Sequence, residues 1–188
     1  MWALGAALIA TYCGMRAHAD VQRQNGISAF HLASSRMPPD PSRWSDGRIR
    51  AYAGTFAAQT LPEAVLRIPS VQLAVPVYAD TNETNLNRGA GLIAGTARPE
   101  GTGNVGIAAH RDGFFRALKD VAVGDRLEVE SLSGTRVYRV TRLSIVSPDD
   151  ISVLRQTPQA TVTLVTCYPF YFVGDAPQRY VVRALAVD

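Results

Sequence analysis

The chain has 188 residues, enough for one domain of ordinary size and a terminal extension. With 47% hydrophobic and 19% charged residues, its composition is that of a globular protein and excludes a largely disordered one. The net charge of +3 comes from arginines scattered among acidic residues, without a basic stripe that carries stacking aromatics, and this argues against nucleic-acid binding.

The amino-terminal run, residues 1–15, carries no charged side chain and is followed by Arg16. As a helix it would be about 22 Å long, shorter than the ~30 Å hydrocarbon core of a bilayer. Three interpretations remain open: a retained membrane anchor in which Arg16 snorkels, a signal peptide cleaved after the small residues 17–19, and a buried soluble helix. We expect export with a retained anchor, and we assign residues 1–19 to a membrane anchor or signal segment.

Residues 20–61 mix arginine, proline and alanine and are expected to form a linker and a helical stalk. Ser45 or Asp46 is a candidate cap for a helix through "GRIRAYAGTFAAQ". Four side chains recur there at helical spacing on one face: Ile49, Tyr52, Ala53 and Phe56. We expect no catalytic residue in this part.

From residue 62 to residue 188 short apolar runs alternate with turn residues. The runs are 64–68, 71–77, 104–109, 126–130, 135–146, 161–166 and 179–187. Several alternate with period two, as half-buried strands do, and no long helical pattern separates them. This arrangement predicts a mostly β domain, either a closed barrel or a sandwich.

Two short helices are expected between the strands. One covers residues 112–120 with Asp112 as its N-cap, and the second covers "DDISVLRQT". The glycine-rich stretch 88–104 lacks the GK[ST] ending of a phosphate-binding loop, so we interpret it as loop and turn.

The two cysteines have different surroundings. Cys13 lies within the apolar amino-terminal run, so Cys167 has no partner for a disulfide inside the folded domain. A lone strand cysteine is often a small buried hydrophobe, but a free thiol in an exported domain is otherwise retained for its reactivity. Such a thiol needs a base, because at its ordinary pKa only a few per cent is thiolate at neutral pH.

His110 is the domain's one histidine, and like Cys167 it follows a predicted strand, so both can reach the same rim of a barrel. Acyl transfer also needs donors for an oxyanion, which a guanidinium supplies. Arg179 opens the strand after the Cys167 loop and is the best placed by sequence, with Arg111 and Arg183 as competitors. Taken singly, His110 reads as a turn residue and Arg179 as a surface charge. One histidine and one cysteine do not make a zinc site, so we expect no metal.

Together these residues resemble a known family, the sortases, which are cysteine transpeptidases of bacterial surfaces. The resemblance covers about residues 62–188. It rests on "TLVTC" at 163–167, on "AHRD" at 109–112 and on the arginine a dozen residues beyond the cysteine in "APQRYVVRA". The longer strings "NVGIAAHRDGFFRALKD" and "LVTCYPFYFVGDAPQRYVVRA" look most like class D-like sortases.

The resemblance implies an eight-stranded β-barrel, an amino-terminal membrane anchor and an extracytoplasmic catalytic domain. It implies a catalytic triad of His110, Cys167 and Arg179, with Thr166 helping to hold substrate and oxyanion, and no cofactor. The implied substrates are exported proteins with a carboxy-terminal sorting signal of the Leu-Pro-x-Thr-Gly kind. The implied acceptor is an amine of a cell-wall precursor or a pilin. Ala109, Gly113 and Leu92 depart from the family's usual residues and leave the preferred signal open.

Two other functions remain open on the sequence alone. A cysteine endopeptidase or hydrolase would release the same thioester to water, although a papain-like enzyme places its cysteine before its histidine, the reverse of the order here. A noncatalytic surface-binding barrel would retain His110, Cys167 and Arg179 but catalyse no reaction.

Overall fold

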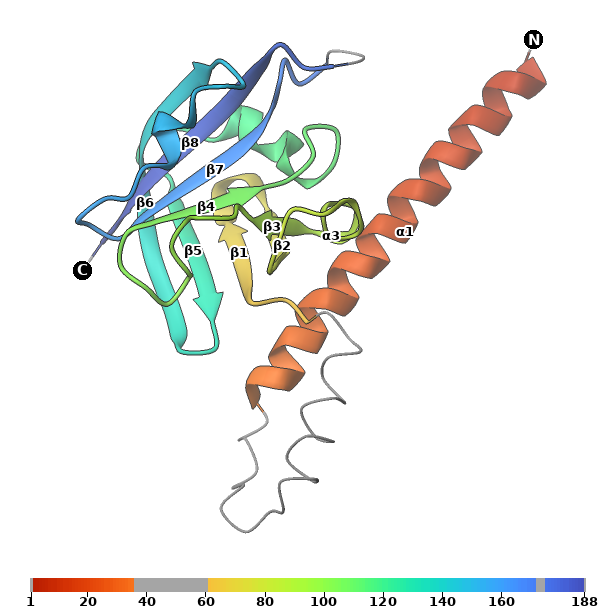
Figure 1. Cartoon of the computed structure of the whole chain (residues 1–188). Helices are drawn as coiled ribbons and strands as arrows, with labels where there is room; N and C mark the ends of the chain where they lie inside the picture. Colours follow the sequence, from red (N-terminus) through yellow and green to blue (C-terminus); the bar gives the residue numbers. More distant parts are fainter. Residues whose placement is uncertain (1, 36–60, 172–174, 188) are drawn as a thin grey trace.

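The apolar runs form strands that close into a barrel. The computed structural model describes residues 2–35, 61–171 and 175–187, and its eight strands follow the order β1-β2-β3-β4-β7-β8-β6-β5 around the barrel (Figure 1). The strands are β1 (Ala64–Ile68), β2 (Leu73–Tyr78), β3 (Ala90–Leu92), β4 (Asn104–Ala108), β5 (Arg126–Ser131), β6 (Gly134–Val146), β7 (Thr161–Tyr168) and β8 (Gln178–Ala186). The expected closed eight-stranded barrel is confirmed.

Two strand pairs in the barrel are parallel, β2 with β3 and β4 with β7, and the other pairs are antiparallel. Alternate residues of each strand point inward and fill one core of aliphatic and aromatic side chains, including Val75, Ile107, Leu164 and Val182. Burial of this core is the main source of stability and fixes the strand registers, since a slip by one residue would turn the apolar side chains outward.

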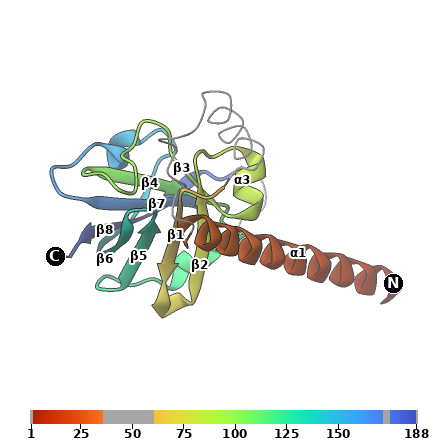
Figure 2. The ribbon, with the colours of Figure 1, turned by 90° about the horizontal axis from the view of Figure 1, so that it is seen from below.

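The amino-terminal segment is a single helix, α1 (Trp2–Ser35), which the sequence places before the first proline of the chain. It runs without a break across the boundary predicted between residues 19 and 20 (Figure 2). Its carboxy-terminal part is docked on the barrel: Phe30 is fully buried, and the Arg23 Nη1 atom donates a hydrogen bond of 3.0 Å to the Ala74 carbonyl. The division of the chain into three parts stays a prediction.

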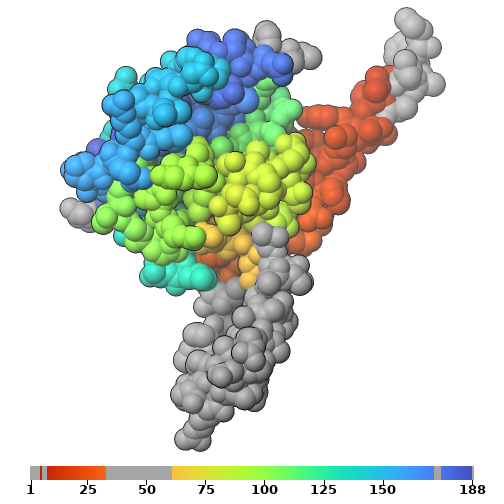
Figure 3. Space-filling model, viewed as in Figure 1, coloured from red at the N-terminus to blue at the C-terminus, as the bar shows by residue number. Residues whose placement is uncertain are grey.

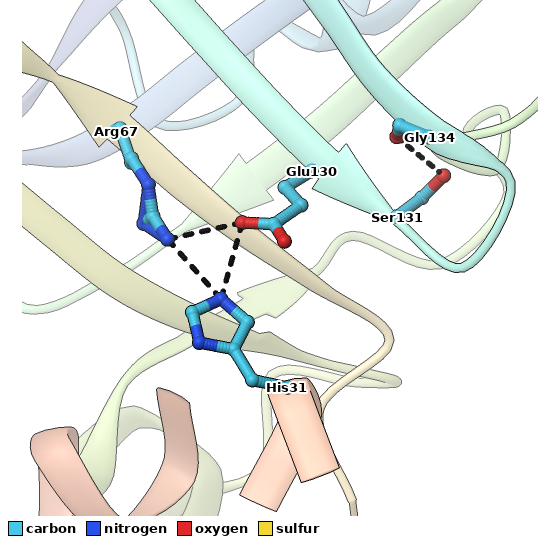
Figure 4. A network of polar contacts seen from close by, with 5 residues as sticks. All are labelled: His31, Arg67, Glu130, Ser131 and Gly134. Carbon is cyan, nitrogen blue, oxygen red and sulfur yellow. Dashed lines mark hydrogen bonds and ion pairs between the residues drawn. The ribbon is translucent and has the colours of Figure 1, made fainter. Parts of the chain in front are cut away.

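A polar cluster joins the end of α1 to strands β1 and β5 (Figure 4). Arg67 Nη2 donates to Glu130 Oε2 at 3.0 Å, and His31 Nε2 lies 3.3 Å from the same oxygen. These contacts are at the surface, so each contributes little alone, but together they fix where the helix leaves the barrel.

The amino-terminal half of α1 extends beyond the barrel, as Figure 3 shows. Leu8, Ile9, Tyr12 and Met15 are all more than half exposed there. Among the described residues no helix combines the length and the hydropathy that crossing a membrane requires.

The short helices differ in part from those predicted. They are η2 (Pro69–Val71), α3 (Glu83–Arg88), η3 (Phe114–Asp120) and η4 (Ile151–Leu154). The two predicted helices are present as the 3₁₀ helices η3 and η4, but Asp112 is not an N-cap. Gly113 occupies that position, and the His110 carbonyl accepts from the backbone amides of Gly113 and Phe115, so the turn needs no side-chain cap.

The glycine-rich stretch 88–104 was predicted to be loop throughout, and this was wrong at one point. Strand β3 lies within it, between β2 and β4. The predicted helix that begins at Ser45 or Asp46 lies outside the described residues.

Candidate active site

Cys167 lies near the end of β7 on the outer face of the barrel. Val162 and Leu164 belong to the core and Thr166 is 3% exposed, so the inward positions of this strand are the even-numbered ones. Because side chains alternate along a strand, Cys167 points to the opposite face, together with Thr163 and Val165. The thiol is half-buried and unpaired.

Arg179 is directly opposite Cys167 in the antiparallel pair of β7 and β8. Directly opposite residues share a face, with Cβ atoms about 5 Å apart, so the guanidinium can reach a group bound to the thiol. In this structure Arg179 Nη1 donates to the carbonyls of Ala176, at 3.2 Å, and Gln178, at 3.0 Å. These are backbone acceptors, one in the loop before β8 and the other at its first residue, and a side-chain rotation would exchange them for an oxyanion.

The other two arginines considered from the sequence lie elsewhere. Arg183 is on the same face of β8, but it is opposite Thr163, which lies four residues before Cys167 in β7. Arg111 Nη1 makes a long contact of 3.4 Å with the Pro169 carbonyl, just after the cysteine. The register therefore brings Arg179, and not Arg183, beside Cys167.

His110 follows β4, which runs parallel to β7 with Ala108 paired to Val165. Strand β4 ends at Ala108, and the same register continued by two residues would set His110 level with Cys167 on the outer face. A buried hydrogen bond holds the two strand ends together: Thr166 Oγ1 donates to the Ala109 carbonyl at 2.8 Å. Thr166 thus fixes the backbone between the two predicted catalytic residues, while its predicted contact with substrate and oxyanion stays a prediction.

Glu83 lies beside the imidazole and was missed by the sequence reasoning. Its Oε1 atom is 3.4 Å from His110 Nε2, within ion-pair distance when the ring is protonated. The contact lacks the alignment of a hydrogen bond, and Nε2 has no hydrogen-bond partner among the described residues. The sequence signal for the helix that carries Glu83 is its N-cap. Asn82 directly precedes α3, and its side chain accepts a hydrogen bond from the Asn85 amide.

An aromatic cluster fixes the chain where it leaves the cysteine. The ring of Phe170 lies 5.7 Å from that of Tyr168 and 5.1 Å from that of Tyr180, measured between centroids. Burial, and secondarily the neighbouring Tyr168, raises the pKa of the Tyr180 hydroxyl. Tyr180 therefore stays neutral through the physiological range and packs against the core, opposite Thr166.

A small cavity of about 140 Å³ lies on the outer face of β6, β8 and β7. Thr163, Val181 and Arg183 contribute from the strands, and Ser152 and Val153 of η4 form the cover. A side chain at Gly106 would clash with this cover, since its Cβ would come within 3.1 Å of a Leu154 methyl group. Among the described residues that line this cavity, which we call the η4 cavity, neither Cys167 nor Arg179 is found, but Val146, the partner of Arg179 in β6, is.

Comparison with known proteins identifies the family of the domain. The family model described as the Sortase domain matches residues 66–187. Sortase D of Bacillus subtilis (strain 168) is 32% identical over 119 residues, which are 63% of this chain and 60% of that protein. Sortase A of Bacillus anthracis is 31% identical over 121 residues, 62% of this chain and 56% of the relative. The matches thus span less than two thirds of the length of these relatives.

Solved structures share the fold over most of the chain. Streptococcus agalactiae sortase C1 superposes with a TM-score of 0.70 at 26% identity, covering 88% of this chain and 95% of that one. The Clostridium perfringens sortase D5 transpeptidase superposes with a TM-score of 0.70 at 20% identity, covering 89% and 99%, a likeness of fold alone.

Proposed function

This chain belongs to the sortase family, and we propose that it is a cysteine transpeptidase in which Cys167 is the nucleophile, Arg179 the oxyanion donor and His110 the acid and base. The observation that carries the proposal is the pairing of Cys167 directly opposite Arg179 on the outer face of β7 and β8. The Thr166 bond to the Ala109 carbonyl supports the role of His110, because it ties the histidine's strand end to the cysteine's.

In the first half of the reaction the Cys167 thiolate attacks the scissile carbonyl and forms a tetrahedral oxyanion. Arg179 leaves its two backbone carbonyls and donates to that oxygen with a permanent positive charge. The His110 imidazolium gives its proton to the leaving amine, the C–N bond breaks and a thioester to Cys167 remains.

In the second half an amine attacks the thioester. His110, now neutral, takes the proton that the amine releases, and a second oxyanion forms beside Arg179. Collapse of this intermediate expels the Cys167 thiolate and leaves a new amide, so the imidazolium and thiolate pair is restored. Because the thiolate and the imidazolium are needed together, activity should pass through a maximum with pH and fall on both sides.

For the acyl donor we propose exported proteins with a carboxy-terminal signal of the Leu-Pro-x-Thr-Gly kind, cleaved after the threonine. The η4 cavity supports this, since Thr163 and Arg183 in its lining lie on the outer face that carries Cys167, and it would hold residues before the scissile bond. The departures at Ala109 and Gly113 flank His110 and would alter the preferred signal.

For the acceptor and the location we propose an amine of a cell-wall precursor or a pilin, reached from the extracytoplasmic side of the cell membrane. Support comes from family membership and from the uncharged residues 1–15, whose first turns would hold the start of α1 at the membrane.

A library of Leu-Pro-x-Thr-Gly-like peptides tests this proposal. Full-length protein is incubated with each peptide, with and without triglycine, and products are identified by mass spectrometry. A transpeptidase joins the acyl fragment to triglycine, whereas a hydrolase releases the free acid at the same rate in both samples. No product from any peptide, together with a Cys167 thiol that resists methanethiosulfonate reagents in the folded chain, would instead favour a noncatalytic binding barrel.

A further inference from the structure

A second cavity, much larger than the η4 cavity, lies between α1 and the barrel. Its volume is about 650 Å³, within the range of sites that bind small molecules. Its walls are α1 from Tyr12 to Arg23, the start of β2, two residues of α3 and the segment 110–119. We call it the α1 cavity, and Figure 3 shows α1 against the side of the barrel that carries these segments.

The α1 cavity reaches one catalytic residue and not the other. His110 is part of its wall, whereas Cys167 is absent from the described residues that line it. The η4 cavity lies on the outer face of β6, β8 and β7, and His110 is not among the described residues that line it. The two cavities share no lining residue, and an amine in the α1 cavity would meet His110, the base that must take its proton.

The wall of the cavity carries more positive than negative side chains. The cations are Arg16, Arg23, Arg116 and Lys119, and the acidic residues are Asp20 and Asp112. Two of the four cations have carboxylate partners. Arg23 Nε lies 3.5 Å from an Asp20 oxygen, and Lys119 Nζ pairs with Asp120. For Arg16 and Arg116 no carboxylate lies within ion-pair distance among the residues described.

Arg116 is held in place but incompletely hydrogen bonded. Its guanidinium carbon lies 4.9 Å from the centroid of the Tyr171 ring, which keeps the group in the wall of the cavity. Its Nε atom is buried and has no hydrogen-bond partner among the described residues. A buried donor without a partner is costly, and a shift of the side chain toward the cavity would let this donor meet an anion there.

From these observations we propose that the α1 cavity binds the amine acceptor, and that Arg16 and Arg116 select acceptors which carry a carboxylate besides the amine. The inference rests on the proposed transpeptidase function and adds the acceptor's chemical class and its site. A guanidinium pairs with a carboxylate through two parallel hydrogen bonds, so two such groups set at the wall favour a small peptide or amino acid over a neutral amine. The helix that forms one wall thereby becomes part of the acceptor site.

The test compares triglycine with triglycinamide, which has the same amine and length but no carboxylate. The transfer rate at each acceptor concentration is divided by the rate of thioester formation of the same protein. The wild type should show a KM for triglycine about tenfold lower than that for triglycinamide. Arg16→Gln and Arg116→Gln should each raise the triglycine KM and leave the triglycinamide KM unchanged, while Arg116→Lys keeps part of the preference.

Arg155→Gln is the matched control, since it removes an exposed arginine after η4, far from the cavity, and should leave the tenfold ratio intact. Circular dichroism of each variant shows whether it is folded. Equal KM values for the two acceptors in the wild type, or an unchanged ratio in both arginine variants, would overturn the inference.

A binding measurement separates this inference from the proposed function. The full-length Cys167→Ala chain, which cannot react, is titrated with triglycine and with triglycinamide while amide chemical shifts are recorded. Shifts at Arg16, His110 and Arg116 with triglycine, larger than with triglycinamide, support the site even if no transfer is ever observed. Transfer without such shifts would leave the transpeptidase standing and refute the α1 cavity as its acceptor site.

Discussion

Replacing Thr166 with valine removes the hydroxyl that ties β7 to the residue before His110 and keeps the shape of the side chain. The hydroxyl is buried, its bond to the Ala109 carbonyl is 2.8 Å long, and Ala109 is 6% exposed, so water does not replace the lost donor. An unsatisfied buried carbonyl costs about 1–3 kcal/mol, and we expect the free energy of unfolding to fall by that amount.

The same change should slow thioester formation. Freed from its partner, the turn at residues 109–110 can shift, and a displacement of about 1 Å in catalytic geometry costs up to 100-fold in rate. We therefore expect kcat/KM for peptide cleavage to fall at least about tenfold in Thr166→Val, mostly through kcat, with Thr166→Ser retaining most of the activity.

Urea denaturation and steady-state cleavage measure the two effects separately. Thr161→Val is the control, because that buried hydroxyl donates to the Gln159 carbonyl at 3.0 Å at the start of β7, remote from the histidine. It should destabilise the fold without a comparable loss of activity. Equal activity losses in the two variants, or full stability in Thr166→Val, would refute the positioning role.

Three further changes test other parts of the molecule. Glu83→Gln should lower kcat/KM about two- to fivefold, since the carboxylate is largely exposed beside the imidazole, and the loss should vanish in 1 M salt if it is electrostatic. Hydrogen bonds from Ser152 lower the pKa of the Asp150 carboxyl in the folded chain. The ionised carboxylate therefore stabilises the fold at pH values above the pKa of the unfolded chain, and this stabilisation is lost as the pH falls through the lower pKa of the folded chain. The difference in melting temperature between Asp150→Asn and the wild type should thus narrow below pH 3.8, and a difference constant with pH would contradict this. Gly26→Leu should weaken the packing of α1 on the barrel, because even a Cβ there would lie 2.7 Å from the Tyr78 hydroxyl. Gly14→Leu is the control, since no atom lies near that position. Equal protease sensitivity of the helix in both variants would rule out this docking contact.

The sequence predicts the barrel well where the strands are long enough to show alternation. Each of the seven apolar runs overlaps an observed strand, because side chains that face a core and solvent in turn leave a period-two pattern. Strand β3 leaves no such pattern, with three residues and a glycine at its centre. Gly91 lies against the Asp80 backbone so closely that any Cβ would overlap the carbonyl oxygen, a tertiary constraint that local sequence does not reveal.

The sequence predicts the residue types of the candidate site, but not the strand register and contacts that position them. Cysteine, histidine and arginine at strand ends are visible in the sequence, whereas the register that sets Cys167 opposite Arg179 is a property of the closed barrel. Glu83 lies in a helix of six residues, too short for a periodic pattern. Residues of α1 line the cavity beside His110 only because the helix docks on a barrel far away in the sequence. The hydrophobic periodicity of the helix does not predict this docking.

Intact-mass spectrometry of the chain after mixing with a Leu-Pro-x-Thr-Gly-like peptide identifies the nucleophile. We expect an adduct with the mass of the acyl fragment on the wild type and on Cys13→Ser, none on Cys167→Ala, and loss of the adduct when triglycine is added. An adduct that survives Cys167→Ala, or product formed by that variant at the wild-type rate, would show that Cys167 is not the nucleophile.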